Sequence, residues 1–562
     1  MSTVVSIAAP AKPENNAQIL RCPITSAFNV AAPPAQSSGQ IVGRITYDRI
    51  PFKFPSGPTP GGPGLDYNNP QVLPVRGAVV EAIAAGANDQ CDGAAVATAL
   101  TDGDGWYRLA SGNTKVCVRV RAQMYRAADN SSAASWNFAV ADNTSANSLY
   151  GMIEASPATA DAQPRRDLHA QSGWSGSSYN ATREAAPFAI LDTACQTMNA
   201  VLDYNGAQSF GSLTFMWSTK NTNDTSGTRE QGKIGGAFFD ANQRAIYLRG
   251  DAAVDTDEFD KMVIAHEFGH FAVHVLSRSD SIGGDHSLLD YLDPRLAFDE
   301  GWATAFAGLA MNDSIYRDSY EAVSLNSLPR EYSFDIQAQY GNTPTGWYSE
   351  MSVQRALYKL GADISDGGVG MGLSSLLQTF SGSYKQTQSL ASIFSYGTFL
   401  KSEQASYAGD IADFLDDENI EGNSITEFAD NETHAESNFD LPVYAVLDTL
   451  GSKQTVCSSD AYGTENTLSN RRYLRFTPPQ SARFKFNVKP FGSGVAGVEV
   501  IDRGSKILYQ QGSTAGATLV ANSDTLQGGR SYVLSIFHIG NVIAGSNVGA
   551  ADKCFQVWAQ AY

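Results

Sequence analysis

Hydrophobic and polar residues alternate in a series of short stretches that begins at Gly39. These stretches are GQIVGRITYDRI, PVRGAVVEAIAA, ATALTDGDGWYRLA and KVCVRVRAQMY, with Gly, Pro and Asp between them. A period of two places every second side chain on the same face of a strand. Several short strands at this spacing predict a small β-sandwich over residues 39–125.

The pattern changes in residues 126–450, where helical and strand periodicities are mixed. Apolar residues recur at helical spacing in FAILDTACQTMNAVLDY, whereas SLTFMWS is typical of a strand and GGAFFDANQRAIYLRG of a hairpin. Further helices are predicted in DEGWATAFAGLAM, EMSVQRALYKLGADI and SIFSYGTFLKSEQ. The region is therefore predicted to be an α+β domain.

Strand-like stretches return in residues 451–562. They are RRYLRFTPP, ARFKFNVKPF, GVEVIDRGSKILYQQ, SYVLSIFHIG and KCFQVWAQAY. Residues 1–38 have no periodicity and are rich in Ala, Pro, Ser and Asn, which is typical of an extended segment. The expected fold is multidomain: an extended N-terminal segment, an all-β sandwich, an α+β domain and a second all-β sandwich.

Length and composition fit a multidomain globular protein. The chain has 562 residues, of which 43% are hydrophobic and 17% charged, and domains typically contain roughly 150 residues. A formal net charge of -19 with no basic run argues against nucleic-acid binding. No stretch reaches the roughly 18 consecutive apolar residues of a membrane span, so we expect no membrane insertion.

The six cysteines bear on the compartment. Two pairs fall within single predicted domains, Cys91 with Cys117 and Cys457 with Cys554, which leaves Cys22 with Cys195. Disulfides are typical of oxidising compartments, so we expect a secreted or periplasmic protein; six buried thiols in a cytosolic protein are the alternative. MSTVVSIAAPAKPENN has neither the basic start nor the long apolar centre of a secretory signal. Either the protein is cytosolic or the sequence begins after a removed signal, and the cysteines favour the second alternative.

The stretch VIAHEFGHFAVHVL, residues 263–276, carries two histidines four residues apart. On a helix, His266 and His270 share one face and can direct two nitrogens at one zinc ion. Glu267 follows the first histidine and can act through a water at the open position of the metal. A third ligand is needed, and Glu300 offers a carboxylate in LAFDEGWATAFAG, whose small residues permit close packing of a second helix.

HEFGH followed by DEGWATAF resembles the gluzincin branch of the zinc metallopeptidases, which have a zincin-like fold. The resemblance implies that His266, His270 and Glu300 bind Zn²⁺ and that Glu267 is the general base. The sequence departs from many gluzincins at Thr304, where an acidic residue would orient a ligand histidine; Asp299 or a backbone carbonyl is the alternative. The 29 residues between His270 and Glu300 are closer to the spacing of bacterial collagenases than to that of thermolysin-like enzymes.

Two further histidines are weighed as ligands. His274 lies eight residues after His266, about 12 Å along a helix, which is too far for one ion, so we expect a structural or supporting role. His286, in the predicted loop GGDHSLLD, remains an outside candidate for a ligand or a substrate contact. The metzincin pattern is excluded because Val273 and Leu276 stand at its Gly and His positions.

GWYSEMSVQRALYKL resembles the downstream thermolysin segment that supplies donors to the reaction's oxyanion. The resemblance implies that Tyr348 is such a donor, although Trp347 stands where a histidine is expected. A buried tyrosine at a helix start is the alternative. The predicted hairpin at residues 235–250 would supply the edge strand that binds extended substrates in gluzincins, and it lacks the GxMEN-type glutamate of aminopeptidases, which favours internal cleavage.

The flanking regions resemble known accessory domains. Residues 39–125 resemble the transthyretin-like, carboxypeptidase-regulatory sandwich, and residues 451–562 resemble the pre-peptidase C-terminal sandwich. Calcium is the second cation weighed, at Asp102 and Asp104 of TDGDGWY and in DFLDDENIEGNS. Turn residues and a solvated helix end are the favoured interpretations, because calcium needs about six oxygen ligands.

The leading functional expectation is a secreted zinc endopeptidase that hydrolyses protein or peptide substrates through a zinc-activated water. One alternative is a glycoprotein-directed metallopeptidase whose sandwiches recognise glycans. The other is a non-catalytic polymer-binding or adhesion protein on a degenerate protease scaffold. Side-chain preference, the oligomeric state and a prosegment role for residues 1–38 do not follow from the sequence.

Overall fold

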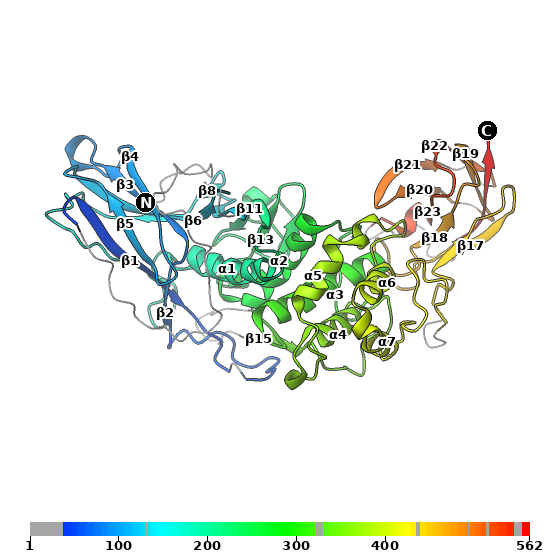
Figure 1. Ribbon diagram of the computed structural model, residues 1–562, viewed down its shortest axis with the longest axis horizontal. Coiled ribbons are helices and arrows are strands. Elements are labelled where there is room, and N and C mark those ends of the chain that lie inside the picture. Colours follow the sequence, from blue (N-terminus) through cyan, green and yellow to red (C-terminus); the bar gives the residue numbers. More distant parts are fainter. Residues whose placement is uncertain are drawn as a thin grey trace. The chain divides into compact units, whose positions relative to one another are not determined.

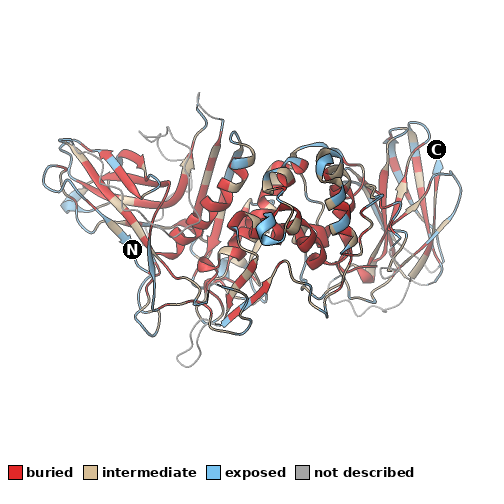
Figure 2. Cartoon of the chain, turned by 60° about the horizontal axis from the view of Figure 1, so that its bottom comes forward, coloured by how far each residue is buried: buried red, intermediate tan, exposed pale blue. Residues whose placement is uncertain are grey.

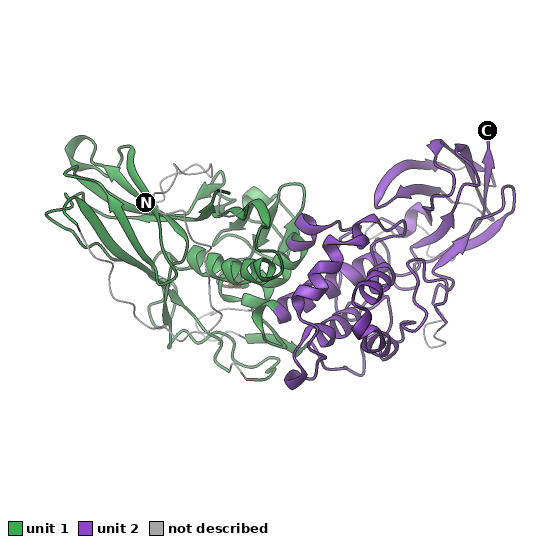
Figure 3. Ribbon diagram, in the orientation of Figure 1, with its two compact units in different colours: residues 1–271, 310–335 green, residues 272–309, 336–562 purple. Residues whose placement is uncertain are grey.

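The structure is a computed structural model (Figure 1). It describes residues 37–54, 56–129, 133–320, 330–433, 439–492, 494–512, 516–543 and 553–562. The chain divides into two compact units (Figure 3): residues 1–271 with 310–335 form unit 1, and residues 272–309 with 336–562 form unit 2. Both contain β-sheets and helices, so the chain is multidomain and rich in β-structure.

A long mixed sheet forms the centre of unit 1. Its order is β12-β13-β11-β7-β6-β3-β4, with the short strands β8 and β9 paired to β7 and β6. The bounds are β3 (Ala78–Ala84), β4 (Ala95–Leu100), β6 (Val116–Arg126), β7 (Ser135–Asp142), β8 (Ser148–Leu149), β9 (Gly151–Ile153), β11 (Ser209–Trp217), β12 (Phe238–Asp240) and β13 (Ala245–Leu248). The predicted boundary after residue 125 falls within β6, and the sheet continues from there through β7 to β11; the division into domains at this point stays a prediction.

A smaller sheet and a hairpin complete the strands of unit 1. The smaller sheet consists of β1 (Gln40–Arg49), β2 (Gln71–Pro74), β5 (Trp106–Ala110) and β10 (Leu168–Ala170). The hairpin consists of β14 (Ile315–Tyr320) and β15 (Arg330–Asp335). In β1 buried and less buried positions alternate after Gly43, whereas β3 is buried along almost its whole length, on both faces of the sheet (Figure 2).

Helices of unit 1 begin with α1 (Ala186–Tyr204), which is buried over most of its surface and contacts β1, β6 and β7. A short helix, η3 (Asp257–Phe259), leads directly into α2 (Lys261–Leu276). The apolar side chains Ile264, Phe268 and Phe271 are completely buried. The run VIAHEFGHFAVHVL is therefore helical, as its apolar spacing predicts.

Unit 2 contains most of the remaining helices. They are α3 (Pro294–Met311), α4 (Glu350–Gly361), α5 (Leu373–Ser381), α6 (Ile393–Glu403) and α7 (Ala408–Asp416). Aromatic side chains fill the space between α3, α5 and α6: Trp302 lies 4.4 Å from Phe380, and Phe298 lies 5.3 Å from Tyr396, between ring centroids. These pairs stabilise the helices by burial of large apolar surfaces and by their edge-on or tilted geometry.

The C-terminal part of unit 2 is a β-sandwich. One sheet has the order β16-β18-β23-β20-β21 and the other β17-β24-β19-β22. The bounds are β16 (Tyr444–Val446), β17 (Gln454–Ser458), β18 (Arg471–Phe476), β19 (Ala482–Pro490), β20 (Ala496–Asp502), β21 (Ser505–Gly512), β22 (Leu519–Leu526), β23 (Tyr532–His538) and β24 (Lys553–Ala561). Side chains of both sheets, such as Phe476, Phe486 and Leu534, share one core.

Each unit contains a disulfide between described residues. Cys91 is bonded to Cys117, and Cys457 on β17 is bonded to Cys554 on β24, as predicted. Cys22, like residues 1–36 in general, lies outside the described residues. None of the described helices has the length and apolar character to cross a bilayer.

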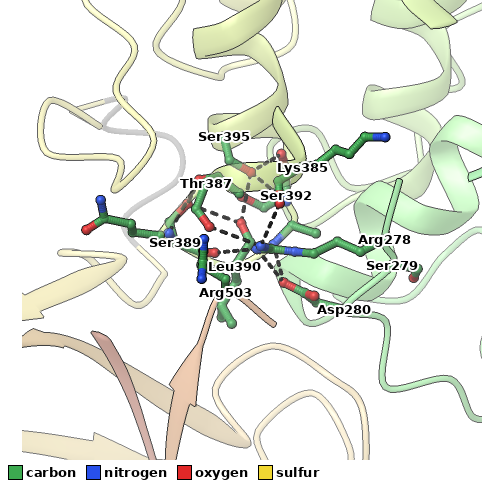
Figure 4. A network of polar contacts seen from close by, with 12 residues as sticks. Arg278, Ser279, Asp280, Lys385, Thr387, Ser389, Leu390, Ser392, Ser395 and Arg503 are labelled. Carbon is green, nitrogen blue, oxygen red and sulfur yellow. Dashed lines mark hydrogen bonds and ion pairs between the residues drawn. The ribbon is translucent and has the colours of Figure 1, made fainter. Parts of the chain in front are cut away.

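A polar network fixes the start of the segment between α2 and α3 within unit 2 (Figure 4). Arg278 donates to the backbone carbonyls of Thr387 and Ser389 at 3.0 and 2.8 Å, and it is 3.2 Å from the Asp280 carboxylate. Asp280 in turn accepts a hydrogen bond from the backbone of Ala391 at 2.7 Å. The segment is therefore held to the chain between α5 and α6 at its first residues.

Candidate metal centre

His266 and His270 lie on one face of α2, one turn apart. Their Nε2 atoms are 3.2 Å from each other, and their ring centroids are 4.9 Å apart at an angle of 80°. Two nitrogens bound to one tetrahedral zinc ion are separated by roughly 3.3–3.4 Å, from bond lengths of about 2.0–2.1 Å. The two imidazoles therefore have the spacing of ligands to a single ion.

Glu267 lies next to His266 and is buried, with 6% of its surface exposed. Tyr316, on β14 of the same unit, faces this region: its ring centroid is 6.4 Å from that of His266. Burial raises the pKa of Tyr316 well above its usual value, and the negative charges of Asp318 and Glu267 add to the effect. Tyr316 is therefore a neutral phenol beside the candidate centre, and no motif in the sequence indicated it.

Glu300 lies on α3, which begins at Pro294 and therefore before the predicted helical stretch DEGWATAFAGLAM. The Asp293 carboxylate accepts from the backbone N–H of Arg295 at 3.1 Å, and Pro294 occupies the first helical position. Gly301 follows the glutamate, and a β-carbon there would be 2.6 Å from the side chain of Val353 on α4. The glycine thus permits the close approach of α4 to the turn of α3 that carries Glu300.

His266 and His270 belong to unit 1 and Glu300 belongs to unit 2, and each residue can offer one ligand atom to a metal ion. The donor set, two imidazoles and a carboxylate, is one that zinc accepts in catalytic sites. His274 belongs to none of the groups of described side chains that could hold a metal ion. The assignment of the three residues as zinc ligands stays a prediction.

His286 lies between two carboxylates of unit 2. Its Nε2 is 3.5 Å from Glu300 and 3.4 Å from Glu350, and its Nδ1 is 3.0 Å from the carbonyl of Gly284. Burial opposes the charged imidazole, but the hydrogen bond and charge of Glu300 and the charge of Glu350 outweigh it and raise the pKa of His286 to about 10. The loop histidine can therefore orient Glu300 by a charge-assisted hydrogen bond.

The sequence did not indicate Glu350 as a site residue, because acidic residues are common at helix starts. It is the first residue of α4 and is buried, with 5% of its surface exposed. Burial raises its pKa to about 7, against the lowering effect of His286. Its closeness to His286 depends on the loop that precedes α3, and such a contact leaves no local pattern.

Tyr348 is buried at the start of α4. Its hydroxyl donates to the carbonyl of Thr345 at 3.1 Å, and its ring stacks on Tyr291 at 5.3 Å between centroids. Its backbone carbonyl accepts from the N–H of Leu292 at 2.8 Å. Tyr348 is thus a buried tyrosine next to a helix start, which is the alternative considered for it from the sequence. Its role as an oxyanion donor stays a prediction.

The remaining candidates have local partners. Asp299 accepts from the hydroxyl of Ser279 at 2.8 Å. Asp102 accepts from the backbone N–H groups of Asp104 and Trp106, both at 2.9 Å, which is the geometry of a turn. In DFLDDENIEGNS, Asp416 accepts from the backbone of Gly422 at 2.7 Å. None of these acidic residues belongs to a metal-capable set among the described residues.

The hairpin formed by β12 and β13 places β12 at one edge of the long sheet. Only β13 pairs with it in that sheet order, so its outer backbone groups face away from the sheet. An edge strand can accept an extended peptide through backbone hydrogen bonds. The sequence predicts an edge strand in the hairpin at residues 235–250, and β12 lies at the edge of the sheet order.

Comparisons with known proteins show no family for this chain. No family profile and no curated protein matches it. Among solved structures, the pre-peptidase C-terminal domain of collagenase from Bacillus anthracis is 12% identical, with 21% of this chain and 96% of that chain covered and a TM-score of 0.15. PliG of Aeromonas hydrophila, a periplasmic inhibitor of g-type lysozyme, is 13% identical, with coverages of 21% and 97% and a TM-score of 0.14. At these TM-scores neither likeness identifies a fold or a function.

Proposed function

We propose that the chain is a zinc-dependent endopeptidase. The observation that carries the proposal is the pair of imidazoles on α2, whose Nε2 atoms are 3.2 Å apart with Glu267 beside them. The proposal assigns Glu300, on α3, as the third ligand, because two imidazoles and a carboxylate are a donor set that catalytic zinc accepts. Zn²⁺ held by these three residues would generate a nucleophile from water near neutral pH and polarise the scissile carbonyl.

Glu267 acts as the general base in this proposal. It takes the proton of the attacking water and transfers it to the nitrogen of the leaving amine, so that one carboxylate serves both halves of the reaction. Its burial keeps bulk water away from the carboxylate, which strengthens its electrostatic interactions. His286 and Glu350 orient the Glu300 carboxylate, and β12 aligns an extended peptide.

The proposed substrates are proteins or peptides, and the proposed location is outside the cytosol. Two disulfides, Cys91–Cys117 and Cys457–Cys554, support an oxidising compartment. Incubation with a random peptide library, with and without a zinc chelator, tests the activity. Cleavage at internal bonds that stops with the chelator and returns with added Zn²⁺ is expected.

Two substitutions test the assignment of roles. Glu267→Gln should retain one zinc per chain but lower the cleavage rate by about 10²–10⁴-fold, because the acid–base group is lost. His270→Ala should lose the zinc, as measured by elemental analysis of gel-filtered protein. Glu184→Gln, at an exposed position of unit 1, is the matched control and should change neither quantity.

Two results contradict the proposal. Full activity of Glu267→Gln would show that Glu267 is not the general base. Full zinc content of His270→Ala would show that His270 is not a zinc ligand. Circular dichroism of both variants separates a loss of metal or activity from a loss of folding.

A further inference from the structure

Four aspartates converge in unit 1, apart from the two histidines. Asp255, Asp257 and Asp260 lie around η3 and immediately before α2, and Asp318 lies on β14. Each offers one carboxylate oxygen, and the four oxygens lie within 4.8 Å of one another. Two segments that are distant in sequence therefore bring four acidic side chains to one point.

The cluster is almost fully removed from solvent. Asp255, Asp257 and Asp260 have no exposed surface, and 22% of the Asp318 side chain is exposed. Buried carboxylates are strongly unfavourable unless cations or hydrogen-bond donors compensate them. A solvated acidic surface, the usual explanation of such residues, does not apply here.

Two arginines compensate the cluster only in part. Arg249 lies 2.8 Å from Asp255, 3.3 Å from Asp257 and 3.6 Å from Asp318. Arg49 donates to the carbonyl of Phe259, and its charge also acts on Asp260. Arg249 is the arginine that forms ion pairs with the cluster among the described residues, and it meets three of the four carboxyl groups.

The carboxylate oxygens of Asp260 and Asp318 differ in their hydrogen bonding. Asp260 accepts from the N–H and the hydroxyl of Ser319 at 3.0 and 2.8 Å, both through Oδ2. Its Oδ1 is buried and has no hydrogen-bond partner among the residues that the structure describes, and the same holds for Oδ1 of Asp318. Acceptors of this kind are rare in folded proteins because each loses its hydration without a replacement.

The pKa values of three of the aspartates are raised, as expected for carboxyl groups with too few positive charges nearby. Burial and the neighbouring negative charges raise the pKa values of Asp255 and Asp260 well above their usual range, and they raise that of Asp318 to about 7. A bound cation opposes these shifts, because a nearby positive charge favours the ionised carboxylate.

We propose that Asp255, Asp257, Asp260 and Asp318 bind a calcium ion. The donors are all oxygens, which calcium prefers, whereas zinc sites favour nitrogen and sulfur. Calcium also accepts six to eight ligands in irregular arrangements, so water can complete a shell that four aspartates begin. Its positive charge favours the ionised form of the carboxyl groups that surround it.

The site joins the start of α2 to the β14–β15 hairpin. Asp260 directly precedes α2, and Asp318 lies two residues from Tyr316, whose ring is near His266. Calcium bound here stabilises the position of the helix that carries both histidines. The inference does not depend on zinc, because it uses none of the proposed zinc ligands.

The test measures calcium content and thermal stability of the full chain. After passage through a chelating resin and reloading with zinc, the protein should bind one calcium ion at a Ca²⁺ concentration on the order of 1 mM, within the range of extracellular calcium modules. Its Tm should rise by about 5 °C, as expected for a ligand that binds only the folded state. Asp260→Asn combined with Asp318→Asn should lose both effects, whereas Glu184→Gln should keep them.

Two further measurements keep the inference independent of folding and of zinc. Tb³⁺ bound to the wild-type chain should luminesce on excitation of Tyr316 and lose the signal when Ca²⁺ is added. His270→Ala should still bind calcium even where it has lost zinc. Absence of calcium binding and of Ca²⁺-displaceable Tb³⁺ luminescence in the wild type, or undiminished calcium binding in the double variant, overturns the proposal.

Discussion

Asp293 and Asp260 are both completely buried, yet their pKa values shift in opposite directions. Burial alone raises the pKa of either group. At Asp293 the charge of Arg295 and hydrogen bonds from Arg295 and Tyr473 outweigh burial and lower the pKa. At Asp260 the charges of Asp318 and Asp257 add to burial and raise it. The facing groups, and not the depth of burial, decide which carboxylate is a stable anion.

The ion pair of Asp293 should make a pH-dependent contribution to stability. Asp293→Asn should lower the free energy of unfolding by about 3–5 kcal/mol at pH 7, because Arg295 is left buried without its counter-charge. The helix cap is preserved, since Asn caps as well as Asp. The folded-state pKa is lowered, so this contribution is present above the unfolded pKa of about 3.9 and is lost as pH falls through the folded value.

Urea unfolding of Asp293→Asn and wild type between pH 7 and pH 3 measures this contribution. The difference between the two proteins should be constant from pH 7 to about pH 5 and should shrink at lower pH. A difference that grows on acidification would show that the Asp293 pKa is not lowered in the folded state.

At the scale of elements, Gly301 illustrates a contact that outweighs helix propensity. Alanine in a helix interior is usually more favourable than glycine by about 1 kcal/mol. A β-carbon at Gly301, however, would lie 2.6 Å from Val353 and 2.8 Å from the carbonyl of Glu350. The backbone carbonyl cannot move without displacing the start of α4.

Gly301→Ala should therefore destabilise the protein by about 1–3 kcal/mol through overpacking. Gly409→Ala in α7 is the matched control, because nothing lies within 4 Å of the added β-carbon, and it should be neutral or stabilising. Thermal unfolding of both variants gives the comparison. Equal changes in the two variants would show that α3 and α4 have room to separate.

Elements that depend on local pattern could be predicted from the sequence, and pairings between distant segments could not. The helix at residues 263–276 lies within α2, and the hairpin at residues 235–250 contains β12 and β13. The parallel pairing of β7 with β11 was not predicted, because period-two alternation identifies a face of a strand but not its neighbour.

The same physical limit applies to the candidate sites. His266 and His270 could be predicted because four residues on a helix specify a common face. The neighbours of Asp318 and the approach of His286 to Glu350 depend on chain segments that meet only after folding. Acidic residues that will be buried look in sequence like those that stay solvated.

At the scale of the whole molecule, the disulfides Cys91–Cys117 and Cys457–Cys554 constrain loops of different length. Cys91 and Cys117 in unit 1 are separated by 26 residues, and Cys457 and Cys554 in unit 2 by 97 residues. In the chain-entropy account, a disulfide stabilises by limiting the unfolded chain, and a longer closed loop gives a larger effect. The bond in the C-terminal sandwich should therefore contribute more than the bond in unit 1.

Paired Cys→Ser substitutions test this order within one protein. Replacement of Cys457 and Cys554 should lower the stability of unit 2 by about 1 kcal/mol more than replacement of Cys91 and Cys117 lowers that of unit 1. Hydrogen exchange of the most protected amides reports each unit separately, so the two losses can be compared without a shared unfolding transition. Cys457 and Cys554 are partners on paired strands, whereas Cys91 lies in a loop. A reversed order would show that interactions in the folded state, and not loop length, dominate the contribution of the bonds.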